Sequence, residues 1–252
     1  MDIKLSGKNI LLTGASRGIG AGLARALGDS GARLALHYNL GKYEAETLAD
    51  EIGNNSFIVQ SDLKNYNSVI ALFDRAKTEM GKIDVLINNA GIALESPISK
   101  DDHDWFRDFE ETLRVNLSSS ALLCKKALNH YMENKRGIII NISSRAAFRG
   151  ETAEYIAYAA SKGGLVSLTR SIAKEFGKYG ITAFNIAPGF VKTDMAQQFF
   201  DEYGEETVLQ NLALNRITEP GDLGPLVVFL SSGLAEHATG TTIDVNAGSY
   251  MH

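Results

Sequence analysis

Short, almost wholly apolar runs alternate along the chain with longer amphipathic segments. Runs of this length without polar alternation are typical of parallel strands that are buried on both faces of a sheet. Several of the segments between them have the spacing of amphipathic helices, and two end in the glycines Gly53 and Gly81. The alternation predicts a doubly wound parallel sheet with helices on both faces. The predicted strands are residues 9–13, 33–37, 57–60, 84–87, 137–142, 181–186 and 241–245.

Composition narrows the class of protein. The 252 residues are 44% hydrophobic and carry a net charge of −5, which gives no reason to expect nucleic acid or an anionic membrane as partner. No apolar run approaches the ~20 residues that span a bilayer, and the N-terminal stretch lacks the pattern of a signal peptide. The single cysteine, Cys124, fits a reducing compartment. We therefore expect a cytoplasmic protein.

The least regular stretch, residues 189–222, follows the sixth predicted strand and ends in EPGD. We interpret it as a mobile substrate loop or lid over a pocket. A surface helical hairpin would explain its composition equally well. No linker divides the chain, so we treat residues 1–252 as one domain.

A glycine-rich turn, TGASRGIG at residues 13–20, follows the first predicted strand and opens a helix. Glycines at 14, 18 and 20 allow the backbone to turn tightly and to approach a ligand closely. The helix N-terminus that follows would offer free N–H groups to a diphosphate. A tight strand–helix connection without a ligand is the alternative for this motif taken alone.

Five motifs together resemble the series found in the short-chain dehydrogenase/reductase superfamily. They are TGASRGIG, NNAG at 88–91, ISS at 142–144, YAASK at 158–162 and PG at 188–189, and they stand in order over essentially the whole chain. The bacterial branch that includes 3-oxoacyl-(acyl-carrier-protein) reductases is the most similar. The resemblance implies a single Rossmann-like domain with a seven-stranded sheet. It also implies reversible hydride transfer between a nicotinamide cofactor and a carbonyl or secondary alcohol.

The resemblance implies four catalytic residues. Tyr158 would be the acid/base, Lys162 its electrostatic partner and ribose ligand, Ser144 the hydroxyl that holds the substrate oxygen, and Asn116 the anchor of a proton-relay water. The tyrosine must titrate well below its usual pH ~10 to work near pH ~7, and a cation one helical turn away would favour the phenolate. Taken alone, the tyrosine and lysine would pass for an ordinary exposed pair four residues apart.

Among the four catalytic assignments, that of Ser144 departs from the spacing of the family. The serine lies one residue farther from the tyrosine than is usual in the family, which places Arg145 at the usual spacing. Because a guanidinium cannot replace a hydroxyl, we retain Ser144 and expect a longer loop, with Ser143 as the alternative.

The resemblance also implies a set of cofactor contacts from the glycine turn, the ends of the second, third and fourth strands, and the segment after the sixth strand. Besides Tyr158 and Lys162, these are Gly14, Ser16, Arg17, Gly18, Ile19, Gly20, Tyr38, Asn39, Asp62, Leu63, Asn89, Ala90, Gly91, Pro188, Gly189, Val191 and Thr193. For Asp62, helix or turn capping is a strong alternative.

We predict NADP(H) as the preferred cofactor, with NAD as the alternative. An NAD-preferring site places an acid at the end of the second strand, where it repels a 2′-phosphate. That position is Tyr38, and no acid occurs from 32 to 43. Arg17 would pair with the phosphate, and His37 and Asn39 would add hydrogen bonds.

Three functions remain open at this stage: reduction of an unassigned ketone, reduction of a 3-oxoacyl group on acyl carrier protein, and dinucleotide binding without catalysis. An acidic carrier would need a basic patch, for which Arg136, Arg145, Arg149 and Arg170 are the candidates. A non-catalytic relative would tend to lose the tyrosine or the lysine, and both are present. The residues expected to line the substrate pocket are Leu94, Phe148, Phe190, Phe199 and Phe200.

Two further expectations concern assembly and metals. We expect a homotetramer whose subunits pair through two long helical segments, about 104–134 and 155–178. The histidines form no metal-like spacing with Cys124, so we expect no metal site.

Overall fold

The computed structural model describes residues 3–194, 196–197, 201 and 204–252, which form one α/β domain around a single parallel sheet. The strand order is β3-β2-β1-β4-β5-β6-β7. The strands are β1 (Asn9–Leu12), β2 (Arg33–Tyr38), β3 (Phe57–Gln60), β4 (Val85–Asn88), β5 (Gly137–Ile142), β6 (Ile181–Pro188) and β7 (Thr242–Val245). All seven predicted strands are confirmed, with ends that differ by at most two residues.

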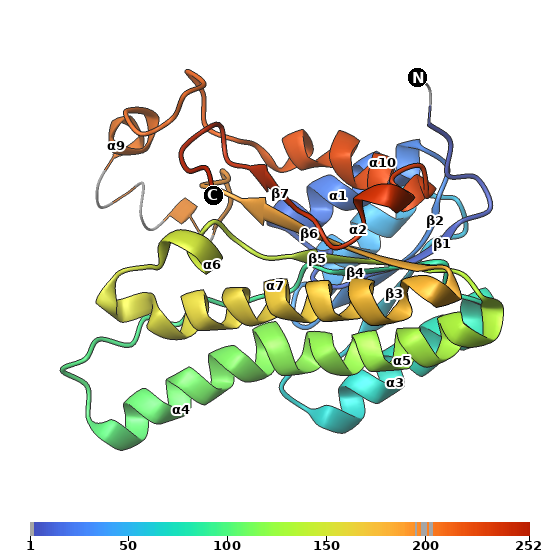
Figure 1. Ribbon diagram of the computed structural model, residues 1–252, viewed down its shortest axis with the longest axis horizontal. Helices are drawn as coiled ribbons and strands as arrows, with labels where there is room; N and C mark the ends of the chain where they lie inside the picture. Colours follow the sequence, from blue (N-terminus) through green and yellow to red (C-terminus); the bar gives the residue numbers. More distant parts are fainter. Residues whose placement is uncertain (1–2, 195, 198–200, 202–203) are drawn as a thin grey trace.

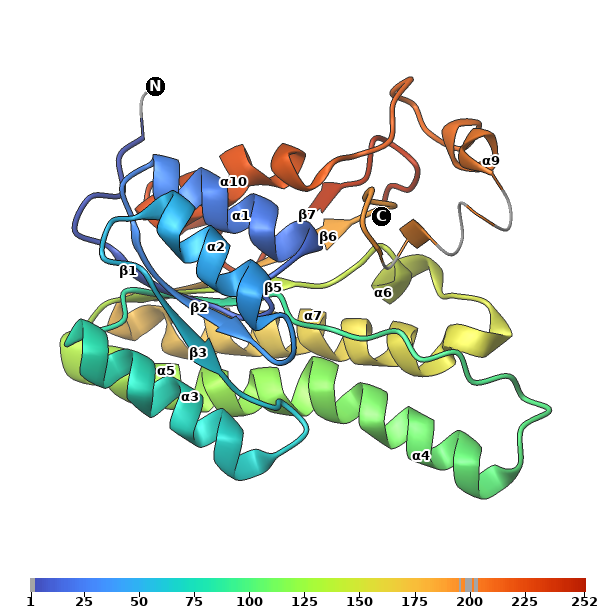
Figure 2. The ribbon, with the colours of Figure 1, turned by 180° about the vertical axis from the view of Figure 1, so that it is seen from behind.

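Helices cover both faces of the sheet, as Figures 1 and 2 show. The helices are α1 (Gly18–Asp29), α2 (Lys42–Ile52), α3 (Tyr66–Met80), α4 (Asp102–Leu113), α5 (Ser119–Asn134), α6 (Ala146–Arg149), α7 (Ile156–Phe176), α9 (Glu205–Leu209) and α10 (Gly224–Ser232). Helices α1, α2 and α10 pack on one face, and α3, α5 and α7 on the other. Successive strand residues pack alternately against the two helix layers. Ile10 and Leu12 pack against the layer of α1, α2 and α10, and Leu11 packs against the layer of α3, α5 and α7. This two-sided burial explains why the strands are apolar throughout.

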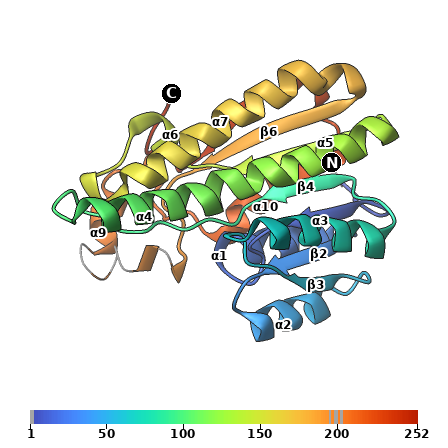
Figure 3. The same ribbon diagram turned by 90° about the horizontal axis from the view of Figure 1, so that it is seen from below.

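The two predicted long helical segments are both present. Helix α4 continues through a π-helical turn, Arg114–Ser118, into α5, and this long helix runs beside α7 (Figure 3). A π-helical turn inside a longer helix often marks a functional position. Here it contains Asn116.

The topology also indicates at which edge of the sheet a ligand would bind, here called the ligand edge. The strand order reverses between β1 and β4, and ligands of such sheets bind beyond the carboxyl ends of the strands at that reversal. Within the predicted lid, Val191 pairs with Thr218 in an isolated bridge. The rest of the lid prediction lies in part outside the described residues, as do Phe199 and Phe200. Among the described residues, no helix is long and apolar enough to cross a membrane.

Candidate active site

The glycine turn packs tightly against neighbouring backbone at the start of α1. Gly14 and Gly18 have φ of +65° and +53°, and a Cβ on Gly14 would lie 2.8 Å from the Cα of Ala90. A Cβ on Gly20 would lie 1.9 Å from the carbonyl oxygen of Gly14. The N-cap residue Arg17 makes no side-chain capping hydrogen bond, and the first turn of α1 contains no acid. The turn therefore fits a dinucleotide diphosphate.

A buried histidine holds this turn in place. The backbone N–H of Gly14 donates to Nδ1 of His37 at 3.0 Å, and Nε2 lies 3.0 Å from the carbonyl oxygen of Ser61. Because a backbone amide can only donate, Nδ1 must be the acceptor and Nε2 must carry the proton. Burial lowers the pKa of His37 to about 4, so the ring is neutral at pH 7. The expectation that His37 hydrogen-bonds a 2′-phosphate is wrong, because both ring nitrogens are occupied.

The NNAG segment is bonded to the same turn from the other side. The Oγ1 of Thr13 accepts from the backbone N–H groups of Asn89 and Ala90 at 2.9 and 3.0 Å. The side-chain amide of Asn89 donates back to the carbonyl oxygen of Thr13 at 2.9 Å. The side chain of Asn88 donates to Oδ1 of Asn141, on the neighbouring strand β5, at 2.8 Å.

The end of β2 combines a buried residue with an exposed one. Tyr38 is buried, with 4% of its surface exposed, whereas Asn39 is exposed. Arg17 is largely exposed and its Nη1 lies 3.7 Å from a carboxylate oxygen of Asp194. An exposed pair at this distance is weak, so the guanidinium stays available to a phosphate.

The carboxylate of Glu44, which lies just beyond the acid-free residues 32–43, approaches the same region. The Oε2 of Glu44 lies 3.1 Å from the position that a Cβ on Gly41 would take, and Oγ of Ser16 lies 3.2 Å from that position. A negative charge here would repel the 2′-phosphate of NADP and so favour NAD. Farther along, Leu63 is buried, and Asp62 accepts a backbone N–H within a turn at 2.9 Å.

Lys162 is buried beneath the tyrosine, as expected from its position one helical turn away. Its Nζ donates to the carbonyl oxygen of Ile142 at 3.0 Å and lies 5.5 Å from the centroid of the Tyr158 ring. Burial lowers the pKa of Lys162 to about 8. A Cβ on Gly91 would lie 3.3 Å from this Nζ, so a side chain there would crowd the lysine.

The pKa of Tyr158 departs from its ordinary value in the direction opposite to the expected one. Burial of the hydroxyl raises it, and the nearby charge of Glu151 raises it further. The hydrogen bond between Ser144 and the tyrosine opposes this rise. Lys162 alone therefore does not make the tyrosine a stronger acid. Additional positive charge is needed for that.

Ser144, rather than Ser143, faces the tyrosine. The Oγ of Ser144 accepts from the backbone N–H of Ala146 at 3.1 Å and is hydrogen-bonded to Tyr158. The Oγ of Ser143 instead donates to the carbonyl oxygen of Ile186 at 3.1 Å, within the sheet. The short helix α6 follows directly, so the chain between serine and tyrosine has room for the extra residue.

Asn116 connects two segments of the site. Its side-chain amide donates to the carbonyl oxygen of Ile92 at 2.8 Å and to Oγ of Ser161 at 3.0 Å, and its Oδ1 accepts from the N–H of Ile92 at 2.8 Å. The backbone carbonyl of Asn116 accepts from Oγ of Ser120 at 3.1 Å. The side chain thus holds the loop after β4 against α7, next to the tyrosine.

The segment after β6 closes the site. Pro188 ends β6, and a Cβ on Gly189 would lie 2.9 Å from the Cα of Asn246, so the two backbones touch. Val191 is buried, and Cγ2 of Thr193 lies 3.2 Å from the position of a Cβ on Gly18. This contact brings the segment next to the glycine turn. The remaining members of the predicted cofactor set, Ser16 and Ile19, are partly exposed on the turn.

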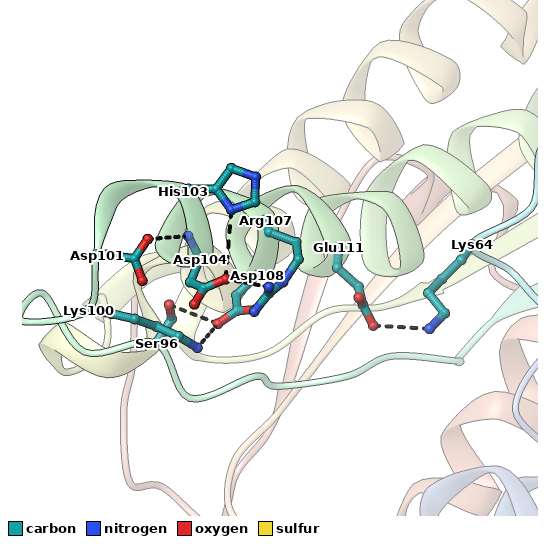
Figure 4. A network of polar contacts seen from close by, with 9 residues as sticks. All are labelled: Lys64, Ser96, Lys100, Asp101, His103, Asp104, Arg107, Asp108 and Glu111. Carbon is teal, nitrogen blue, oxygen red and sulfur yellow. Dashed lines mark hydrogen bonds and ion pairs between the residues drawn. The ribbon is translucent and has the colours of Figure 1, made fainter.

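A polar network at the start of α4 (Figure 4) is the strongest metal candidate among the described residues. Ligand atoms of Asp101, His103 and Asp104 lie within 4.8 Å of one another, and all three side chains are near the surface. Asp101 caps α4 by accepting the N–H of Asp104 at 3.1 Å, and Asp104 pairs with Arg107. Capping and ion pairing account for the cluster, so we assign no metal to it.

Comparison with known proteins agrees with this geometry. The family model described as enoyl-(acyl carrier protein) reductase matches residues 14–250. A 3-oxoacyl-(acyl-carrier-protein) reductase of Staphylococcus aureus is 35% identical over 97% of this chain and 98% of its own length. The enzyme of the same name from Vibrio cholerae is 34% identical over 99% and 100%. A solved dehydrogenase/reductase of Sinorhizobium meliloti has a TM-score of 0.90 at 29% identity, covering 99% of this chain and 98% of that one.

Proposed function

This chain belongs to the short-chain dehydrogenase/reductase superfamily and is an NAD(P)-dependent oxidoreductase, and we propose that it reversibly reduces a ketone to a secondary alcohol with NADP(H). The observation that carries the proposal is the placement of Ser144, Tyr158 and Lys162 at one point on the ligand edge. The bound nicotinamide would supply the hydride.

The side chains divide the remaining chemistry between them. The hydroxyls of Ser144 and Tyr158 would hold the carbonyl oxygen, and Tyr158 would donate its proton to that oxygen as the alcohol forms. Lys162 would bond the cofactor ribose, and Asn116 would keep the loop after β4 in register with α7. Gly14, Gly18, Gly20 and the N-terminus of α1 would hold the diphosphate. A panel of ketones and alcohols tested with each nicotinamide cofactor checks this assignment, and an absence of turnover with every pair would count against it.

Reduction of a 3-oxoacyl group on acyl carrier protein is the second candidate, supported by the names of the 33–35% identical relatives. Three of the four arginines considered for a carrier-binding patch do not support it. Arg145 is buried, and Arg149 pairs with Glu151 at 2.9 Å. Arg136 precedes β5, at the edge of the sheet opposite the site. Assay with an acyl-carrier thioester against the free ketone distinguishes the two candidates.

A further inference from the structure

Only two lysine or arginine side chains are buried within the described part of the chain, and both lie beside the candidate active site. They are Lys162, 4% exposed, and Arg145, 8% exposed, and none of the described aspartates or glutamates is buried. The proposed cofactor contact and proton chemistry account for the lysine. Nothing in that chemistry accounts for the arginine.

Arg145 lies at the substrate end of the site rather than at the diphosphate end. It follows Ser144 in the chain, and its backbone N–H donates to the carbonyl oxygen of Pro188 at 3.0 Å. Its guanidinium carbon lies 4.9 Å from the centroid of the Phe190 ring, and its Nη1 donates to Oγ of Ser249 at 2.5 Å. The guanidinium is therefore enclosed by the segment after β6 and by the C-terminal segment.

The charge of Arg145 is not balanced by a described carboxylate within 4.0 Å. Glu151 is the acid whose charge affects the pKa of Arg145, and both of its carboxylate oxygens lie 2.9 Å from Nη2 of Arg149. Burial, followed by the charge of Arg149, lowers the pKa of Arg145. A buried cation with only neutral partners is costly, and a fold that keeps such a group generally uses it. The guanidinium has five donors in a planar fork that matches a carboxylate.

We propose that Arg145 binds a carboxylate of the substrate, so that the carbonyl compound reduced at Ser144 and Tyr158 is an oxo acid. The proposal rests on the function proposed above and narrows its substrate class. The cofactor phosphates do not compete for this role, because the glycine turn and Arg17 lie at the end of β1, whereas Arg145 lies at the ends of β5 and β6.

The competing explanation is that Arg145 only anchors the C-terminal segment through Ser249. Two variants separate the explanations. Arg145→Met removes the cation and keeps much of the packing, whereas Ser249→Ala removes the anchoring hydrogen bond and keeps the cation. Arg145→Lys keeps the charge without the fork and should be intermediate.

The experiment compares kcat/KM for 2-oxo, 3-oxo and 4-oxo acids with the values for their methyl esters, using NADPH. We expect the wild-type enzyme and Ser249→Ala to prefer the acid of at least one pair. Arg145→Met should lose at least about 10-fold of that preference, as expected when charge-assisted hydrogen bonds are removed. Equal use of acids and esters by the wild type, or an equal loss for both in Arg145→Met, would overturn the proposal while leaving ketone reduction intact.

A binding measurement keeps the proposal testable if none of these ketones is reduced. Calorimetric titration of the same oxo acids into the enzyme–NADPH complex should show binding that Arg145→Met weakens and Ser249→Ala preserves. Acid binding without turnover would contradict the proposed function alone. Absence of binding to the wild type would contradict the role of Arg145.

Discussion

The backbone N–H of Gly14 donates to Nδ1 of His37 across 3.0 Å, and the opposite nitrogen of the same ring bonds the carbonyl of Ser61. One neutral imidazole thus joins the turn proposed for the diphosphate to the end of β3, where the adenine would lie. His37 touches neither group in this role. It acts through the backbone that does.

Removing this ring should weaken cofactor binding. His37→Leu leaves the Gly14 N–H and the Ser61 carbonyl without partners, and each unsatisfied buried group costs about 1–3 kcal/mol. We expect the Kd for NADPH to rise at least about 10-fold. His37→Asn, whose Oδ1 can replace Nδ1 as acceptor, should restore most of the affinity. Fluorescence titration of NADPH measures both, and a Kd for His37→Leu close to wild type would show that the ring does not position the turn.

The same histidine should make the fold sensitive to acid. Its native pKa of about 4 lies below its ordinary 6.5, so the unfolded chain binds the proton more tightly. Stability that is fully present above pH 6.5 is therefore lost as the pH falls towards 4, by about 3 kcal/mol for this group. Urea unfolding at several pH values across this range tests the expectation. His37→Asn should show a shallower loss, and identical pH dependence in both proteins would contradict the assignment.

Cofactor preference should depend on two opposite charges near the end of β2. Arg17→Ala should lower kcat/KM for NADPH more than for NADH, because it removes the cation proposed to pair with the 2′-phosphate. Glu44→Gln should shift the ratio in the other direction, since it removes a carboxylate from the same region. Tyr38→Asp is a poor probe because it would bury a carboxylate. If the wild type uses NADH as well as NADPH, the preference for NADP(H) is wrong.

Assembly is a separate expectation. Helices α4 and α7 carry exposed apolar side chains, including Phe106 at 55% and Ile156 at 41% exposure. Burial of these side chains against a second subunit would favour the predicted tetramer. Light scattering at micromolar concentration should give four times the mass of the chain, and Phe106→Glu should lower it. A monomeric mass for the unsubstituted protein would exclude the tetramer.

The sequence predicts the sheet well because burial on both faces makes each strand a short, continuous run of apolar residues. Which motif residues meet was implied by the resemblance to the short-chain dehydrogenase/reductase superfamily, because the hydrophobic pattern places strand ends at one edge of the sheet but does not select side chains. The two hydrogen bonds of His37 could not be predicted from the sequence, because its partners are backbone groups that lie 23 and 24 positions away. The rise in the pKa of Tyr158 in the chain alone could not be predicted either, because spacing reports the proximity of Lys162 but not the burial of the hydroxyl. The isolation of Arg145 from carboxylates likewise depends on the packing of distant segments.

The central claim is that Tyr158 supplies the proton in catalysis, and its hydroxyl is the group to remove. Tyr158→Phe deletes one hydroxyl and keeps the aromatic ring in place, so the fold and NADPH binding should persist. Single-turnover and steady-state kinetics with the best ketone should then show kcat reduced by ~10²–10⁴-fold, the usual contribution of general acid–base catalysis. Retention of more than about a tenth of the wild-type kcat by Tyr158→Phe would contradict the mechanism.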